Sequence, residues 1–328
     1  MKNKDIVLER CLSDFPLRIA ITDYCNLRCF FCSNEGMPLC QKNKQHIDFK
    51  KLKKLISILT ERGLKKISLT GGEPTLHPEI YKIINFLKRF KFKELYLHTN
   101  GSLLSRELLE KSVGSFTKIA ISVHSVNFAS WQKITSGAKQ QFDRIMKNIE
   151  LASSYKNKFL VELKYVPVKG WSDSDTEFSD FLELCSLYKL KFKFLNFEII
   201  TKAQEGLSLP FNEVKKKLLS LGCQEKLDEK IFRGQSRYLP IKRLKYKNVF
   251  GVAIEIGCGE PKVCEECYLS NEIFLTPQLE IKPCHASNYK IDLNQLIDKK
   301  DSQSIFNAIV DSRKFLATAP GLGKKTWQ

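Results

Sequence analysis

The sequence lacks any apolar stretch long enough to cross a membrane. A membrane-spanning helix needs about 20 consecutive apolar residues, and no run in the 328 residues approaches that length. The N-terminus is charged and short of apolar residues, so a secretory signal is lacking too. A disulfide framework is disfavoured without such a signal. We therefore expect a cytoplasmic protein, without a membrane partner, whose 11 cysteines are reduced thiols.

Arginine and acidic residues are both scarce relative to lysine. Lys and Arg together number 54 against 36 for Asp and Glu, which gives a formal net charge of +18. A charge of this sign raises the question of nucleic-acid binding. Phosphate recognition tends to recruit arginine forks, whereas these lysines are spread over helix faces, as in residues 50–54. The charge supports an anionic substrate more than RNA.

Short apolar runs alternate with helical patterns along the first two thirds of the chain. With 43% hydrophobic residues, the chain can bury one barrel-sized core plus a smaller domain. Six strand–helix units predict an α/β fold, a partial (β/α)6 TIM-like barrel with function at the C-terminal ends of its strands. We expect the barrel in residues 1–222 and a smaller C-terminal domain in 223–328. The predicted strands are 17–22, 66–70, 94–98, 118–123, 159–166 and 192–200; the predicted helices are 48–63, one opening at Pro78, 104–111, 142–154, 176–188 and 211–221.

Three cysteines lie on one short loop directly after the first predicted strand. Cys25, Cys29 and Cys32 have the spacing C-x3-C-x2-C, and Phe31 precedes the last of them. An iron–sulfur cube has four irons, so three thiolate ligands leave one iron open to a group that is not protein. An open position distinguishes a catalytic metal site from a structural one.

A single structural zinc ion is the main alternative for this loop. Such sites usually add a second Cys/His pair a dozen or more residues later. The nearest downstream candidates, Cys40 and His46, are unpaired and awkwardly spaced. The loop therefore favours a polynuclear centre.

A second segment, Gly71-Gly72-Glu73-Pro74, follows the second predicted strand. The two glycines allow backbone to come close to a ligand, and the carboxylate can accept hydrogen bonds from an ammonium group. Taken alone, the segment would indicate only a turn.

Polar residues end the next two strands as well. Thr99 and Asn100 follow the third strand, and Ser122 ends the fourth. Their side chains could face the same barrel mouth, although each also fits an ordinary turn or surface position. His124 fits a core position equally well and is left without a role.

The cysteine loop, followed one strand–helix unit later by Gly-Gly-Glu-Pro, resembles the radical S-adenosylmethionine (radical SAM) enzymes. The resemblance implies a 4Fe–4S cluster on Cys25, Cys29 and Cys32, whose open iron chelates SAM, and an external one-electron donor of the flavodoxin or ferredoxin type. The SAM-binding residues that it implies are Phe31, Gly71, Gly72, Glu73, Pro74, Thr99, Asn100 and Ser122.

A second cysteine group lies in the C-terminal part of the chain. Cys258, Cys264, Cys267 and Cys284 surround a hairpin-like stretch, 272–281, that could bring three thiolates together. Four cysteines with one C-x2-C also fit a zinc knuckle, and this alternative stays open.

Most of the chain resembles one radical SAM family, the GTP 3',8-cyclases of molybdenum-cofactor biosynthesis. The similar segments are 17–23, the cysteine loop, 66–74, 99–101, 121–123 and the cysteines 264, 267 and 284. The resemblance implies a second, auxiliary 4Fe–4S cluster on Cys264, Cys267 and Cys284, whose open iron touches a purine substrate. It places Arg18 and Lys66 where relatives contact nucleotide phosphates; both could also be strand-edge charges facing solvent.

Three departures from that family bear on the substrate. The arginine pair that holds the triphosphate is replaced by Tyr268-Leu-Ser-Asn271, and the C-terminal Gly-Gly tail is missing. Losing two charge-assisted contacts of ~1.5–3 kcal/mol each would weaken nucleotide binding by orders of magnitude. Cys258 could act as a fourth auxiliary ligand and close that cluster to substrate.

The sequence therefore predicts a radical SAM enzyme that takes hydrogen from a small, anionic or nucleotide-like substrate. Alternatives are a GTP 3',8-cyclase proper, and a radical SAM maturase or dehydrogenase acting on a sugar, cyclitol or peptide precursor. A metal-bound RNA-binding protein without catalysis would leave the Gly-Gly-Glu-Pro segment unexplained. No catalytic side chain is predicted.

Overall fold

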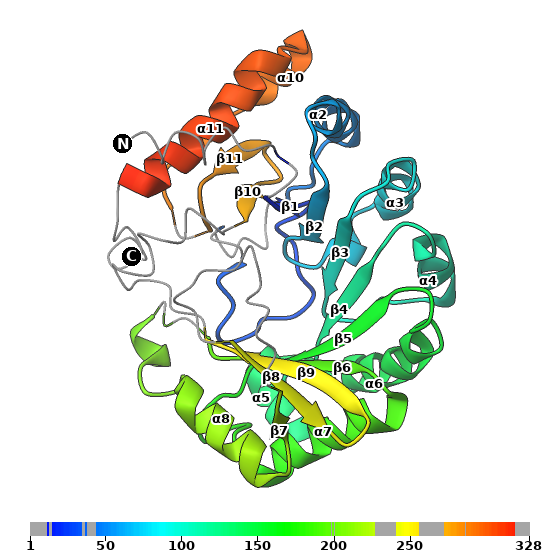
Figure 1. Cartoon of the computed structure of the whole chain (residues 1–328), viewed down its shortest axis with the longest axis vertical. Coiled ribbons are helices and arrows are strands. Elements are labelled where there is room, and N and C mark those ends of the chain that lie inside the picture. Colours follow the sequence, from blue (N-terminus) through cyan, green and yellow to red (C-terminus); the bar gives the residue numbers. More distant parts are fainter. Residues whose placement is uncertain are drawn as a thin grey trace.

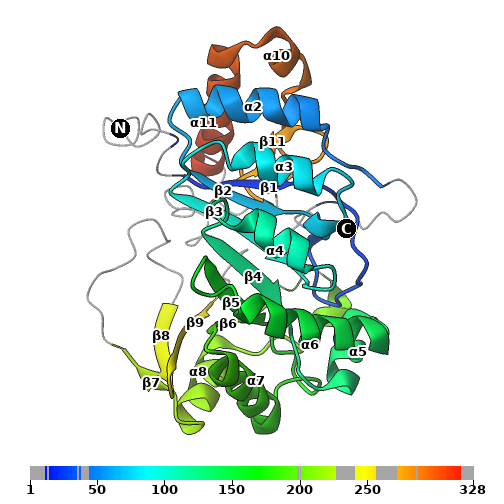
Figure 2. The ribbon, with the colours of Figure 1, turned by 90° about the vertical axis from the view of Figure 1, so that its right-hand side faces the viewer.

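The computed structural model describes residues 12, 15–34, 37, 44–197, 199, 201–226, 241–255, 272–285 and 287–318. Their strands form one 12-stranded sheet that curves into a partial barrel, with helices on its outside (Figure 1). Turned by 90°, the molecule shows α2, α3, α4 and α6 side by side over the strands (Figure 2). The predicted α/β partial barrel is confirmed.

Six parallel strands form the centre of the sheet in sequence order, as predicted. The sixth strand ends earlier than predicted. The strands are β1 (Leu17–Ala20), β2 (Lys66–Thr70), β3 (Glu94–Thr99), β4 (Lys118–Ser122), β5 (Leu160–Tyr165) and β6 (Lys191–Leu195).

Helices follow the strands on the outside of the barrel. Asp48 caps the first of them: its Oδ1 accepts a hydrogen bond of 2.9 Å from the Lys51 N–H. The predicted helix start at Pro78 is two residues early: the Ile83 N–H donates to the Glu79 carbonyl at 3.0 Å, and the helix begins at Ile80. The predicted helices are α2 (Phe49–Glu61), α3 (Ile80–Leu87), α4 (Arg106–Ser112), α6 (Lys139–Ser153), α7 (Asp175–Tyr188) and α8 (Phe211–Ser220).

Residues beyond 222 add strands to both edges of the same sheet. On one edge β10 (Ile273–Leu275) pairs parallel with β1, and β11 (Glu280–Lys282) and β12 (Ile291–Asp292) follow it. On the other edge β9 (Val249–Ile254) pairs parallel with β6, and β8 (Ile241–Tyr246) and β7 (Gln224–Glu225) follow. The predicted hairpin at 272–281 is β10–β11.

The division into two domains at 222 stays a prediction. Helices α10 (Asn294–Lys299) and α11 (Ser302–Thr318) end the described chain.

Alternate residues of the central strands face opposite sides of the sheet, because side chains on a strand alternate. The side toward the helices is apolar: Ile19, Ile67, Leu97, Ile121 and Leu163 are all 0% exposed. The opposite side lines the lumen of the barrel and carries charged residues. One apolar face and one polar face therefore place the core between sheet and helices and leave the lumen for function.

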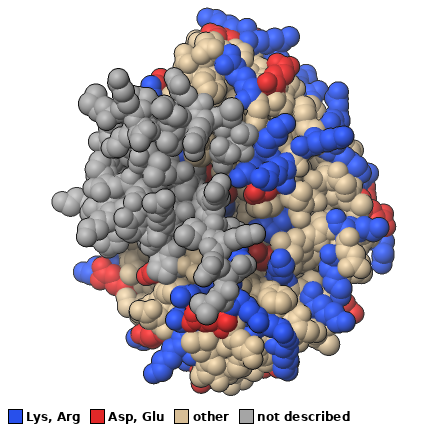
Figure 3. Space-filling view, viewed as in Figure 1, with Lys and Arg blue, Asp and Glu red and all other residues tan. Residues whose placement is uncertain are grey.

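Positive charge on the outer surface is dispersed. Figure 3 shows lysines and arginines spread over the described part of this face, interspersed with acidic and neutral residues. Among the described helices, none combines the length and apolarity that crossing a bilayer requires.

An aromatic cluster anchors β6 to the helix layer. The Phe194 ring lies 4.9 Å from Phe178, 5.3 Å from Phe181 and 5.2 Å from Tyr165, measured between ring centroids. Phe194 is fully buried, so its ring fills space that no neighbour can easily take over.

We expect Phe194→Ala to lower the free energy of unfolding by about 3–5 kcal/mol, because a large cavity replaces the ring. Phe250→Ala is the control: its side chain is 51% exposed on β9, and its removal should cost under about 0.5 kcal/mol. Denaturant titration of both variants measures the difference, and equal costs would contradict this packing arrangement.

Candidate functional site

The cysteine loop is fixed to a helix that the sequence did not predict. In helix α5 (Phe128–Thr135) the carbonyl of Thr135 accepts a hydrogen bond of 2.8 Å from the Arg28 N–H. The carbonyl of Ile134 accepts another, also 2.8 Å, from the Phe30 N–H. The last turn of α5 therefore pairs with the middle of the loop and holds it across the barrel mouth.

Cys25 is the cysteine most closely tied to the rest of the site. Its Sγ accepts hydrogen bonds from the Leu27 N–H at 3.4 Å and from Asn100 Nδ2 at 3.8 Å. Burial raises the pKa of the Cys25 thiol to about 12; Glu73 and Cys32 raise it further, against the lowering effect of the Leu27 and Asn100 hydrogen bonds. Without a nearby cation, this thiol stays protonated.

Cys29 behaves in the same way. Burial, followed by the negative charges of Cys32 and Cys25, raises the pKa of the Cys29 thiol well above its usual value. The three thiols thus oppose one another's ionisation, and a bound metal centre would supply the positive charge that stabilises three thiolates.

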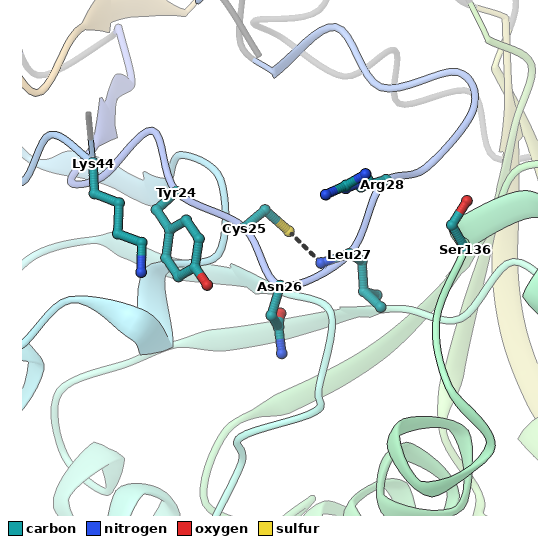
Figure 4. A pocket seen from close by; sticks show the side chains of 7 residues that line it. All are labelled: Tyr24, Cys25, Asn26, Leu27, Arg28, Lys44 and Ser136. Atoms are coloured by element: carbon teal, nitrogen blue, oxygen red, sulfur yellow. Dashed lines mark hydrogen bonds between the residues drawn. The ribbon is translucent and has the colours of Figure 1, made fainter. Parts of the chain in front are cut away.

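The donor set fits a centre with several metal atoms. In the described part of the chain, no three Cys, His, Asp or Glu side chains converge closely enough to hold one metal ion. A cavity of about 480 Å³ lies against the loop. In Figure 4 the Cys25 sulfur and the Arg28 side chain come from two sides of the loop's bend, whereas Asn26 points away from it. The lining of this cavity includes Cys25, and three cysteines on one loop suit an iron–sulfur cube, with each cysteine on a different iron.

Gly71 and Gly72 bring two backbone segments together. A Cβ on Gly71 would lie 2.1 Å from the Thr22 carbonyl oxygen, and one on Gly72 would lie 2.2 Å from that of Tyr24. The Gly72 N–H donates to Thr22 O at 2.8 Å, and the Glu73 N–H donates to Tyr24 O at 2.7 Å. The two glycines therefore pack against the entry to the cysteine loop; their contact with SAM stays a prediction.

The Glu73 carboxylate is buried and held in one orientation. Its Oε1 accepts hydrogen bonds from the hydroxyls of Thr75 at 2.5 Å and Thr99 at 2.6 Å, and from the Thr75 N–H at 3.1 Å. Its Oε2 accepts one, from the Asn100 N–H at 2.6 Å. Burial raises the pKa of Glu73, and these hydrogen bonds oppose the rise. Oε2 retains acceptor capacity for a further donor.

Asn100 connects Glu73 with the cysteine loop. Its backbone N–H binds Glu73, while its Nδ2 donates to Asn26 Oδ1 at 2.8 Å and approaches Cys25 Sγ. The Thr99 hydroxyl acts through Glu73, to which it donates. The structure therefore brings Cys25, Glu73, Thr99 and Asn100 together, as the resemblance implied.

The other predicted SAM contacts lie around this centre. Pro74 is buried and begins the short helix η2 (Pro74–Leu76), and Ser122 is half-buried at the end of β4. The Phe31 ring stacks on Phe197 at 5.5 Å and meets the edge of His124 at 4.8 Å. Their contacts with SAM stay predictions.

His124 is buried and neutral beside Phe31. Its Nδ1 has no hydrogen-bond partner, and burial, with the charge of Lys164, lowers its pKa to about 3. It packs like a core residue, one of the two roles that the sequence left open.

Arg18 and Lys66, the predicted substrate contacts, both lie on the lumen wall with carboxylate partners. Arg18 Nη1 lies 2.9 Å from Glu272 Oε2, and Lys66 Nζ lies 3.6 Å from Glu94 Oε1. Their side chains are only 19% and 16% exposed, so neither faces open solvent as the alternative interpretation had it.

Sequence analysis missed most of the charged residues around Arg18. Lys118, Glu162, Lys164 and Lys193 influence one another and Arg18 electrostatically. Together with Arg18 and Glu272 we call these six residues the lumen cluster. The available signal was a charged residue at alternate positions of otherwise apolar strands, as in Lys164 within β5.

Within the lumen cluster, two lysines lie side by side on neighbouring strands. Lys164 on β5 and Lys193 on β6 are paired in register. Burial, then Lys193 and Arg18, lowers the pKa of Lys164 far below its usual value, and burial also lowers that of Lys193. Lys164 Nζ lies 2.6 Å from His98 Nδ1; since burial and then Lys164 keep the pKa of His98 low, a neutral imidazole can accept this hydrogen bond.

The second cysteine group falls largely outside the described residues. This holds for Cys258, Cys264 and Cys267, whereas Cys284 is half-buried two residues after β11. The auxiliary cluster stays a prediction.

Gly72→Ala should displace the cysteine loop, because the new Cβ would overlap the backbone of Tyr24. We expect a loss of about 1–3 kcal/mol in the free energy of unfolding and faster reaction of Cys25 with a thiol reagent in metal-free protein, mapped by mass spectrometry. Gly170→Ala is the control for backbone strain alone: its φ of +72° disfavours alanine, but its Cβ would meet nothing within 4 Å, so Cys25 reactivity should stay unchanged. Unchanged Cys25 reactivity in Gly72→Ala would contradict the assigned backbone contact.

Comparison with known proteins gives relatives over most of the chain. The GTP 3',8-cyclase of Clostridium acetobutylicum is 28% identical over 291 residues, 87% of this chain and 85% of that protein. The molybdenum cofactor biosynthesis protein moc-5 of Caenorhabditis elegans is 29% identical over 305 residues; these are 90% of this chain but 47% of moc-5, so the chain spans about half of that protein.

Solved structures show the same fold. SuiB of Streptococcus suis, crystallised with S-adenosylmethionine, superposes with a TM-score of 0.66 at 15% identity, over 94% of this chain and 71% of SuiB. The Radical SAM superfamily model matches residues 19–182, which include the cysteine loop and the Gly-Gly-Glu-Pro segment. The chain therefore belongs to the radical SAM superfamily and is a radical SAM enzyme.

Proposed function

We propose that this enzyme takes a hydrogen atom from a small anionic substrate held in the barrel lumen. The observation that carries the proposal is the placement of the Cys25–Asn100–Glu73 contacts at the C-terminal ends of the strands whose lumen faces bear the lumen cluster. When bound, a 4Fe–4S cluster and SAM supply one-electron cleavage of the sulfonium carbon–sulfur bond, giving methionine and a 5'-deoxyadenosyl radical.

The residues at the mouth have separate tasks in this proposal. Cys25, Cys29 and Cys32 hold the cluster, and Glu73 Oε2 accepts a hydrogen bond from the SAM ammonium group. Thr99 and the backbone of Asn100 orient the carboxylate through the hydrogen bonds already described. Because these donors are fixed before SAM arrives, Glu73 needs little reorganisation to bind it.

Lys164 and Lys193 form the proposed site for the substrate's negative group. Two buried cations side by side repel each other. Among the described residues, no carboxylate lies within ion-pair distance of either lysine. An anion between them would offset that repulsion and raise the pKa of Lys164 toward its usual value, so a phosphate or carboxylate is the chemistry that this site favours.

An auxiliary 4Fe–4S cluster on Cys264, Cys267 and Cys284 completes the proposal. With three ligands its open iron can bind substrate, whereas a fourth ligand, Cys258, would close it and leave only electron transfer. A flavodoxin or ferredoxin type protein would supply the electrons.

A GTP 3',8-cyclase proper is the second candidate, because curated relatives over most of the chain carry that name. Against it, the Arg18 guanidinium is already bound to a carboxylate. Efficient cyclisation of GTP, abolished by Arg18→Ala, would restore this assignment.

Anaerobically purified protein should carry about eight irons per chain, the content of two cubes. Replacing Cys25, Cys29 and Cys32 together by alanine should remove about half of this iron, because the auxiliary cysteines remain. Iron analysis and absorption spectroscopy measure both. Stoichiometric zinc without iron after reconstitution would be decisive against the proposal.

Glu73→Gln should weaken SAM binding by about tenfold or more, because one charge-assisted hydrogen bond is lost, while the iron content stays unchanged. The control is Glu79→Gln, which removes only an exposed ion pair with Lys82. Binding is measured by titrating SAM into the cluster-loaded protein, and turnover by release of 5'-deoxyadenosine. Wild-type SAM affinity in Glu73→Gln would contradict the role given to Glu73.

A further inference from the structure

The lumen cluster contains more basic than acidic side chains, and one of its carboxylates, Glu272, forms an ion pair with its arginine, Arg18. Its four cations are Arg18, Lys118, Lys164 and Lys193, and its two carboxylates are Glu162 and Glu272. Glu162 belongs to the lysine side: Lys118 Nζ lies 3.5 Å from it, and although burial alone would raise its pKa, Lys118, Lys193 and Lys164 hold it below the usual value. With all six side chains ionised, the state that an anion bound between Lys164 and Lys193 would favour, cations exceed carboxylates by two.

Glu272 holds Arg18 from the neighbouring strand. It lies one residue before β10, which pairs parallel with β1. Its Oε2 contacts Arg18 Nη1 at 2.9 Å, and its Oε1 accepts a hydrogen bond of 3.2 Å from the Ser68 hydroxyl on β2. The side chains of Arg18 and Glu272 are 19% and 27% exposed, so water screens this pair only in part. Glu272 is therefore tied to two neighbouring strands and fixes its charge on the lumen wall.

We propose that Glu272 is a specificity-determining residue that limits the anionic part of the substrate to one phosphate or carboxylate group. The inference rests on the proposed function, in which the lumen binds the substrate. A single phosphate carries a charge of about −1.5 to −2, which matches the excess of two positive charges. Each further phosphate would find that excess already neutralised and would meet the Glu272 carboxylate, and like charges in a partly buried site repel strongly.

The contact with Arg18 adds a second effect. A phosphate that binds Arg18 would share the guanidinium with the Glu272 carboxylate, which Nη1 already contacts, and the two anions would repel each other. A polyphosphate would therefore meet the Glu272 carboxylate at Arg18 as well as in the lumen, whereas a single anionic group at Lys164 and Lys193 needs no contact with Arg18. Glu272 thus distinguishes substrates with one anionic group from polyphosphates, both of which Lys164 and Lys193 would otherwise accept.

The test compares GMP and GTP, which differ only in the number of phosphates, by calorimetric titration into cluster-loaded protein with SAM present. Wild-type protein should bind GMP more tightly than GTP. Glu272→Gln should raise the affinity for GTP by about tenfold and that for GMP much less, so that the ratio of the two affinities shifts. In an Arg18→Gln background, the same substitution should give a smaller gain, because the guanidinium that would contact the further phosphates is absent.

Glu280→Gln is the matched control, since Glu280 pairs with the exposed Lys290 at 2.7 Å and lies on β11, two strands away from β1. An equal gain in this control would show a general charge effect and overturn the inference, as would tighter binding of GTP than GMP by wild type, or no binding of either. If Glu272→Gln is unstable, Glu272→Ala gives the same comparison. If the wild-type protein releases no 5'-deoxyadenosine, the proposed function is overturned. The ratio of the GMP and GTP affinities can still be measured in that case.

Discussion

The close approach of two backbone segments, Gly71–Gly72 against Thr22–Tyr24, is the contact on which the site depends. It extends the pairing of β1 and β2 past the ends of both strands. The same few residues therefore fix where the cysteine loop begins and where the Glu73 carboxylate lies. A side chain larger than hydrogen at either glycine would separate the two, because backbone atoms cannot yield as a flexible side chain can.

Sequence patterns predicted the strands and most helices because each signal is local. The capping of α2 by Asp48 and the apolar runs of β1 to β6 depend on neighbouring residues only. The role of Gly72 could not be predicted, since its contact partner Tyr24 lies on another strand's continuation. Lys164 and Lys193 were not predicted as site residues for a related reason. Strand alternation places both lysines on the side opposite the helices, but it does not show whether that side faces a lumen or solvent. Only the curvature of the sheet distinguishes them.

The two sides of the sheet differ in character: the side facing the helices forms the core, and the lumen side carries the charged residues of the proposed site. The side facing the helices is mostly apolar and includes Phe194 and its aromatic neighbours. The lumen side holds charges whose mutual repulsion costs stability unless a ligand offsets it. If the lumen binds the substrate as proposed, such a division lets substitutions there change the ligand while the helix-facing core preserves the fold. The Arg18–Glu272 contact is a local example, because it spans β1 and β10 without entering that core.

The pairing of β9 with β6 and of β10 with β1 has a consequence for synthesis of the chain. Both edges of the six-strand sheet are completed by residues that follow residue 240. While the ribosome is still adding the last quarter of the protein, β1 and β6 have unpaired N–H and C=O groups along one side. Unpaired edges of this kind recruit other strands. The nascent chain is therefore most exposed to strand mispairing in the interval before β10 emerges.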